Sequence, residues 1–181
     1  MNESLTPKEL VEEGQAAYQR GDYTAAAQDF YAASKGYDAL GDALTSAEML
    51  NNCSVAHLKA GESEAALKVV EGTEEIFAKA GDLRRQGIAL GNLGAALEAL
   101  DRLEEALTAY EKSGDLLKEA GEKELRAHVM KSLSAIQLRT GRQMEAIATM
   151  QAGLDGLDRP SLKQRLLKVL LRTPFKILEK K

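Results

Sequence analysis

The sequence of 181 residues has few of the residues that interrupt helices or cross-link small folds. Its only prolines are Pro7, Pro160 and Pro174, so no proline limits helix length between the first two. Cys53 is the only cysteine, which excludes an intrachain disulfide and a CxxC metal site. Tryptophan is absent, and aromatic residues make up 4% of the chain. Instead, more than half of the residues are Ala, Leu, Glu, Lys or Arg, a composition typical of long helices.

Charge and hydropathy exclude further classes of protein. The formal net charge of −4 argues against a nucleic-acid-binding module. The longest uncharged run near the middle of the chain, Gln86 to Leu97, is too short to span a bilayer. The first residues, MNESLTPKELVEE, lack the basic and then apolar pattern of a signal peptide. We therefore expect a cytoplasmic protein, with peripheral attachment to a membrane as the alternative.

The chain repeats itself with a period of 40 residues. A shift of 40 positions aligns four alanines, which are Ala26, Ala66, Ala106 and Ala146. It also aligns four small residues, which are Gly14, Ser54, Gly94 and Ser134. Turn glycines recur with the same spacing at Gly41, Gly81 and Gly121. Four copies in one register indicate a stack of similar structural units.

Each copy predicts two helices. Apolar and small residues recur three and four positions apart, and glycines end the segments. We expect helices at about 7–20, 22–40, 42–60, 62–80, 82–100, 102–120, 122–140 and 142–157. Thr6, Pro7 and Glu9 form a helix start, because a threonine cap and a glutamate three residues later make a capping box. The very short turns predict antiparallel packing of neighbouring helices.

This pattern resembles the tetratricopeptide repeat. The third copy carries that family's residues most completely, namely Leu90, Leu93, Gly94 and Leu97, followed by Ala106, Tyr110 and Ser113. The resemblance implies an all-α fold, a right-handed superhelix (solenoid) of four helix pairs. We place the repeats in residues 1–158, at about 7–40, 41–80, 81–120 and 121–158. The 40-residue copies resemble the repeats of kinesin light chains and LGN/Pins-type adaptors, because the usual closing proline is missing.

The sequence contains no motif that would support catalysis. It has neither GxxxxGK[ST] nor GxSxG, and His57 and His128 lack metal-ligand spacing. We expect a protein that is not an enzyme and that has no cofactor and no metal. His57 is interpreted as a packed or half-buried side chain, and Cys53 as a small buried hydrophobic residue.

The resemblance also suggests where a ligand would bind, because the first helices of such repeats line a concave groove. The positions expected in this groove are Gln15, Tyr18, Asn51, Asn52, Val55, Lys59, Asn92, His128, Lys131, Ser132 and Arg139. Asn52 and Asn92 are equivalent in successive copies, and their amides could pair with the main chain of an unidentified protein or peptide ligand. The alternative is an asparagine bonded to water or to a neighbouring helix.

The groove lacks the basic cluster that a clamp for chaperone C-terminal carboxylates requires. Lys131 and Arg139 are the nearest cations, and both belong to the fourth copy. A ligand with an acidic or polar part near the fourth repeat therefore suits the surface better. The leading hypothesis is a non-catalytic adaptor that binds an extended or helical peptide in the groove.

The last segment, residues 159–181, differs from the repeats. It holds eight Lys or Arg and one Glu, a charge of +7, whereas residues 1–158 sum to −11. An amphipathic helix is expected from Ser161, with a break at Thr173 and Pro174. The residues assigned to a membrane or partner contact are Leu162, Arg165, Leu166, Lys168, Leu170, Arg172, Phe175 and Lys176.

Two interpretations of this segment stay open. It could be a helix that caps the apolar end of the last repeat. It could also attach the protein to an anionic membrane, to a helical partner or to a second copy, without any role for nucleic acid. The alternative function is therefore a peripheral membrane or self-association module.

Overall fold

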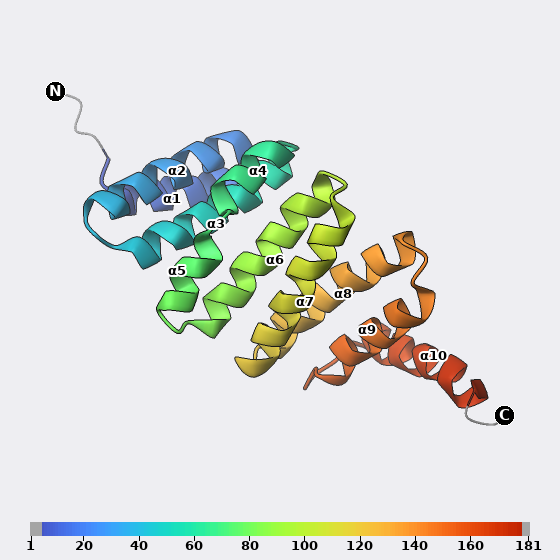
Figure 1. Cartoon of the computed structure of the whole chain (residues 1–181). Coiled ribbons are helices and arrows are strands. Elements are labelled where there is room, and N and C mark those ends of the chain that lie inside the picture. Colours follow the sequence, from blue (N-terminus) through green and yellow to red (C-terminus); the bar gives the residue numbers. More distant parts are fainter. Residues whose placement is uncertain (1–4, 179–181) are drawn as a thin grey trace.

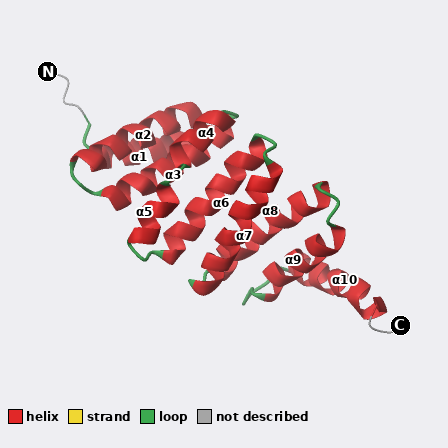
Figure 2. Cartoon of the chain, in the orientation of Figure 1, coloured by secondary structure: helices red, strands yellow, loops and turns green. Residues whose placement is uncertain are grey.

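The computed structural model describes residues 5–178 of the chain and the surroundings of side chains as far as Leu171. Within these residues the chain forms ten α-helices and no strand (Figure 2). They are α1 (Pro7–Arg20), α2 (Tyr23–Ala39), α3 (Ala43–Ala60), α4 (Ser63–Val70), α5 (Thr73–Lys79), α6 (Leu83–Ala99), α7 (Leu103–Glu119), α8 (Lys123–Arg139), α9 (Gln143–Asp155) and α10 (Leu162–Leu178). The predicted all-α solenoid is confirmed.

The helices stack in chain order from the N-terminal to the C-terminal end (Figure 1). The first helices of the pairs are α1, α3, α6 and α8, and each packs on the helix that follows it. Buried alanines lie where second helices cross their neighbours, with Ala26, Ala66 and Ala106 fully buried. Such positions stay small because helices approach closely only where side chains have little bulk.

Local signals in the sequence set the helix ends. The capping box at Thr6 is formed, since Glu9 N donates to Thr6 Oγ1 and Thr6 N donates to Glu9 Oε2 at 2.8 Å. Gly61 ends α3 with a φ of 80°, a left-handed conformation that glycine adopts without strain. Asp101 takes the same conformation in the third pair, with a φ of 58°. These short turns keep each pair antiparallel.

The helix expected at 62–80 is wrong, because the chain breaks it into α4 and α5. Gly72 has a φ of 79° and separates the two helices. Thr73 is buried, and its hydroxyl donates to the Val70 carbonyl at 2.8 Å, a group left over at the end of α4. The same hydroxyl accepts a hydrogen bond from Asn51 Nδ2 at 3.0 Å. A tertiary bond to α3 therefore fixes the break.

The break expected at Thr173 and Pro174 is also wrong, because α10 continues to Leu178. A proline inside a helix removes one N–H···O bond at a cost of about 3 kcal/mol, which the flanking turns outweigh here. The segment is also an incomplete cap. It packs beside α9 at the C-terminal end (Figure 1), but Leu162, Leu166 and Leu170 stay 83%, 62% and 59% exposed.

Candidate functional site

One face of the stack is hollowed between each pair of successive first helices. The first hollow, about 340 Å³, lies between α1 and α3, and the second, about 140 Å³, between α3 and α6. The third, about 160 Å³, lies between α6 and α8, and the fourth, about 450 Å³, between α8, α9 and α10. Adjacent hollows share lining residues, first Asn52, then Ile88 and Asn92, then His128. The four hollows therefore form one continuous groove.

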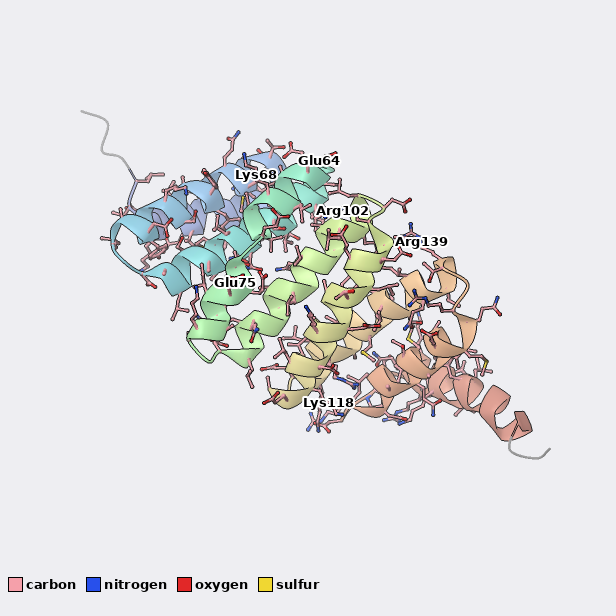
Figure 3. All side chains as sticks on the ribbon, in the orientation of Figure 1. Glu64, Lys68, Glu75, Arg102, Lys118 and Arg139 are labelled. Carbon is pink, nitrogen blue, oxygen red and sulfur yellow. The ribbon has the colours of Figure 1, made fainter. Side chains whose placement is uncertain are left out.

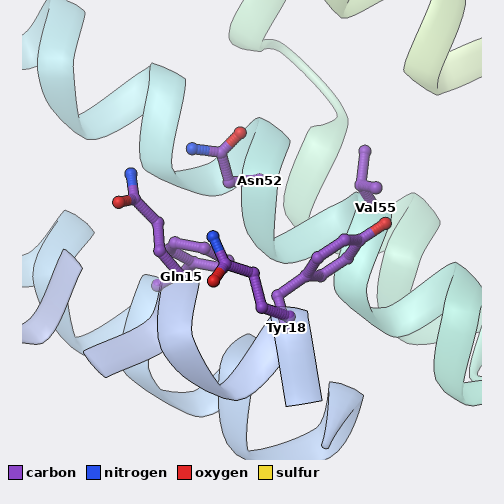
Figure 4. A pocket seen from close by; sticks show the side chains of 6 residues that line it. Gln15, Tyr18, Asn52 and Val55 are labelled. Carbon is purple, nitrogen blue, oxygen red and sulfur yellow. The ribbon is translucent and has the colours of Figure 1, made fainter. Parts of the chain in front are cut away.

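The first hollow is lined by uncharged side chains. Gln15 and Tyr18 of α1 face Asn52 and Val55 of α3 across it (Figure 4). Phe30 of α2 also lines it. Tyr18 is held by an edge-to-face contact with the ring of Tyr23, at 5.2 Å between centroids. The hollow thus combines an apolar surface with three amides, those of Gln15, Gln19 and Asn52, which can both donate and accept hydrogen bonds.

Asn51 lines the second hollow, but its amide differs from that of Asn52 because it is already hydrogen-bonded within the protein. Its side chain is buried, and its Nδ2 donates to the carbonyl of Ala47 at 2.9 Å and to Thr73 Oγ1 at 3.0 Å. Its Oδ1 accepts from Asn92 Nδ2 at 3.0 Å. The break between α4 and α5 explains the difference, because it brings the Thr73 hydroxyl against α3.

Asn52 and Asn92 are equivalent in sequence but not in their surroundings. Asn92 is half-buried, and its amide nitrogen is engaged with Asn51. Asn52 is also half-buried, yet it makes no hydrogen bond within the described residues and contributes to both the first and the second hollow. Of the two predicted groove asparagines, Asn52 is therefore the one whose whole amide remains available.

The fourth hollow is lined by two lysines, one histidine and a single carboxylate, that of Glu124. His128 and Lys131 of α8 and Lys163 of α10 line it, and all three are exposed and without an ion pair among the described side chains. Met150, Leu154 and Leu167 give it an apolar floor. The participation of α10 was not foreseen, because the sequence assigned that helix only to a cap or to an outside partner.

Two other residues expected in the groove, Arg139 and Lys59, lie at its margin. Arg139 is engaged, with its guanidinium 2.7 Å from Asp101 and 3.3 Å from Glu98. Lys59 is exposed but lines none of the four hollows. Ser132 lines the third hollow. The second hollow also has two cations, Arg84 and Arg85, but both are in ion pairs. The lysines without an ion pair among the described side chains are therefore those of the fourth hollow.

The third hollow contains one polar group that is held inside the protein. The Tyr110 hydroxyl donates to Glu98 Oε2 at 3.1 Å. Burial of the ring raises the pKa of Tyr110 well above its usual range, and the nearby Glu98 carboxylate raises it further. Tyr110 therefore stays neutral and acts as a fixed wall of the hollow.

The residues assigned to the tail fall into two groups. Arg165 donates from Nε to the Pro160 carbonyl at 3.2 Å, and Lys168 lies 2.6 Å from Asp155. Leu162, Leu166 and Leu170 form the exposed apolar face described above. Three further residues predicted for this contact lie outside the range of described side chains, namely Arg172, Phe175 and Lys176.

The remaining candidates for chemistry are structural. Cys53 is fully buried, 3.2 Å from the Ala27 carbonyl, and burial raises the pKa of its thiol to about 12. His57 Nδ1 lies 2.6 Å from Glu62 Oε2 and is half-buried. Both predictions for these residues are confirmed. The described part of the chain contains no group of three or more residues able to hold a metal ion.

Comparison with known proteins identifies the repeat. The family model for the tetratricopeptide repeat matches residues 85–159, which run from α6 to just beyond α9. This match covers less than half of the chain and supports the tetratricopeptide-like repeat that the sequence predicts. Proteins built from these repeats are generally scaffolds for protein interaction, and the fold is typically non-catalytic.

A solved structure extends this likeness over most of the chain. The crystal structure of BtubC (BKLC) from P. vanneervenii superposes with a TM-score of 0.71 at 13% sequence identity, over 92% of this chain and 71% of that one. At this identity the likeness concerns the fold alone. Comparison with curated proteins gives no match in sequence. Among the described helices, none is long and apolar enough to cross a membrane.

Proposed function

We propose that this protein is an adaptor that binds an extended or helical peptide along the groove formed by the four hollows. The sharing of Asn52, Asn92 and His128 between neighbouring hollows carries the proposal, because a continuous groove suits a linear ligand better than isolated pockets do. The groove runs from α1 to α10, so one ligand can contact every repeat.

The two ends of the groove call for different ligand chemistry. At the first hollow, Tyr18, Val55 and Phe30 suit an apolar side chain, while Gln15 and Asn52 can pair with the ligand main chain. At the fourth hollow, His128, Lys131 and Lys163 surround apolar side chains and attract a carboxylate that stands beside an apolar residue. The ligand is therefore expected to be uncharged at one end and acidic at the other.

Selection of peptides from a random library displayed on phage, with the full chain as bait, tests this proposal. The selected peptides should pair apolar residues with Asp or Glu. Their affinity, measured by fluorescence anisotropy, should fall about tenfold on Lys131→Glu and about fivefold on Asn52→Ala. Lys68→Glu is the matched control, because Lys68 is an exposed residue of α4 outside all four hollows (Figure 3). Peptides whose affinity is unchanged by both groove variants would contradict the proposal.

A second candidate function is association through α10. It is favoured by the exposure of Leu162, Leu166 and Leu170 on a segment whose net charge is +7. Three leucines spaced four residues apart form one apolar face, and a basic helix with such a face binds anionic membranes or acidic protein surfaces. The side of α10 that carries Lys163 and Leu167 lines the groove. Both functions can therefore reside in one chain.

Vesicle co-sedimentation of the full chain tests the membrane form of this candidate. Phosphatidylserine vesicles at low salt should bind the protein, whereas phosphatidylcholine vesicles should not. Leu166→Glu with Leu170→Glu should abolish the binding. Equal sedimentation of wild type and variant would exclude α10 as the attachment.

A further inference from the structure

A fifth hollow lies on the other side of α6 from the groove. It measures about 440 Å³, and we name it the convex trough. Its floor is Leu90, Leu93 and Leu97, which helical spacing places opposite the groove residues Ile88 and Asn92. Its sides come from α5 and α7, between which α6 lies (Figure 1). The trough adjoins the break at Gly72, so it is a feature of this chain rather than of the repeat.

The rim of the convex trough is acidic. It carries Glu74 of α5 and Glu104 and Glu105 of α7, with Lys112 as its one cation. The Glu105 carboxylate lies 2.6 Å from the Arg102 guanidinium, whereas the carboxylate of the exposed Glu104 has no partner among the described residues.

Glu74 distinguishes this rim from an ordinary solvated acidic surface. Its Oε2 is shielded from solvent and accepts no hydrogen bond from any described group. A shielded carboxylate oxygen without a donor is costly, and native proteins seldom leave one unsatisfied. The trough therefore lacks a cationic or N–H donor on this side, above a floor of leucines.

The chain itself contains a segment with the complementary chemistry. Leu162, Leu166 and Leu170 of α10 form an exposed row, and the segment 159–181 carries +7 against −11 for the rest of the chain. Within one copy α10 lies beside α9 at the end of the stack, away from α5, α6 and α7 (Figure 1). Its exposed face can therefore reach a convex trough only on another copy.

We propose that α10 of one copy docks into the convex trough of a second copy, an inference that rests on the second candidate function. The leucines of α10 cover Leu90, Leu93 and Leu97, and cations of the tail segment meet Glu74 and Glu104. Reciprocal docking closes a symmetric dimer, whereas docking in one direction builds a chain of copies.

Sedimentation equilibrium of the full chain over a range of concentrations and salt tests the proposal. At low salt the mass should rise above the 19.6 kDa of one copy, and added salt should lower it. Leu166→Glu with Leu170→Glu should weaken association at least tenfold, and so should Glu74→Lys with Glu104→Lys. Glu64→Lys is the matched control, because Glu64 is an exposed carboxylate of α4 outside the trough (Figure 3).

Two further variants separate docking from misfolding. Glu104→Lys with Thr108→Arg alters only exposed positions of α7, so it should block docking while the helical circular dichroism stays unchanged. Arg165→Glu should also weaken association, because Arg165 is an exposed cation of α10 that does not line the groove. Mixing that variant with Glu74→Lys plus Glu104→Lys should restore part of it through reversed charges.

The outcomes distinguish docking into the convex trough from association through α10 in general. A single copy at every concentration overturns the inference, and if phosphatidylserine vesicles then bind α10, its partner is a membrane. Association that needs the α10 leucines but ignores the trough substitutions also overturns the inference, while association through α10 survives. The docking proposal is supported if the α10 variants and the trough variants both lose association, and if mixing the charge-reversed variants restores part of it.

Discussion

The second and third helix pairs have equivalent positions in the 40-residue repeat, but the two helices of each pair contact each other differently. In the third pair α7 is continuous, and Ser113 Oγ donates directly to the Gly87 carbonyl of α6 at 2.6 Å. In the second pair the equivalent carbonyl is that of Ala47, and it accepts from Asn51 Nδ2 at 2.9 Å. The hydroxyl of Thr73, the counterpart of Ser113, reaches α3 only through Asn51.

Two positions distinguish the pairs. Asn51 stands where the third pair has Gly91, and the absence of a side chain at Gly91 lets α7 approach α6 closely. In the second pair an amide occupies that space, and the second helix breaks at Gly72, where the third pair has Lys112. The comparison teaches that an added side chain on one helix, together with a break in the other, replaces a direct helix contact with a bridged one, with the convex trough beside it.

The largest loss of stability is expected at Gly94, where the helices of the third pair pack most tightly. A Cβ on Gly94 would lie 2.8 Å from Cδ1 of the buried Tyr110 ring, so Gly94→Val should lower the free energy of unfolding by about 3 kcal/mol. Chemical denaturation with an unchanged m-value measures it. The counterpart in the second pair is Ser54, whose buried hydroxyl has no hydrogen-bond partner among the described groups. Ser54→Ala should therefore cost less than about 0.5 kcal/mol, and an equal loss in both variants would contradict the comparison.

A smaller loss of stability is expected when the hydrogen bonds that Asn51 makes in the second pair, here called the bridge, are removed. Asn51→Leu removes the side-chain hydrogen bonds to the Ala47 carbonyl and to Thr73 Oγ1 and leaves the amide nitrogen of Asn92 without its acceptor, so the free energy of unfolding should fall by about 2 kcal/mol. Thermal unfolding followed by circular dichroism measures the loss. Asn52→Leu is the control, since Asn52 makes no hydrogen bond among the described residues. If the two variants unfold at the same temperature, the bridge does not stabilise the second pair.

Much of the fold could be predicted because it depends on local and periodic signals. The 40-residue register, the capping box at Thr6 and the buried alanines all follow from residue type and spacing. The break at Gly72 did have a signal, since the equivalent positions are Ala32, Lys112 and Ala152. A helix tolerates one glycine for about 1 kcal/mol, however, so periodicity alone favoured a continuous helix.

The groove was predicted less completely because its composition depends on contacts between distant residues. Spacing placed Asn52, Asn92 and His128 on one face, and these residues join the hollows. Spacing could not show that Thr73 would bury Asn51, or that α10 would bring Lys163 beside Lys131. An amphipathic pattern predicts a face, but only packing decides what covers it.

The smallest loss of stability is expected at Gly72, where the second helix of the second pair breaks into α4 and α5. Gly72 has a φ of 79°, where any side chain is strained, so Gly72→Ala should lower the free energy of unfolding by about 1 kcal/mol. No neighbouring atom lies within 4 Å of the added Cβ, so the cost is conformational rather than steric. The equivalent Lys112 lies inside the continuous α7 and is exposed. Lys112→Ala should therefore change the free energy of unfolding by less than about 0.5 kcal/mol. A Gly72→Ala variant as stable as Lys112→Ala would mean that the second helix can straighten at no cost, and the break would then not be a fixed difference between the two pairs.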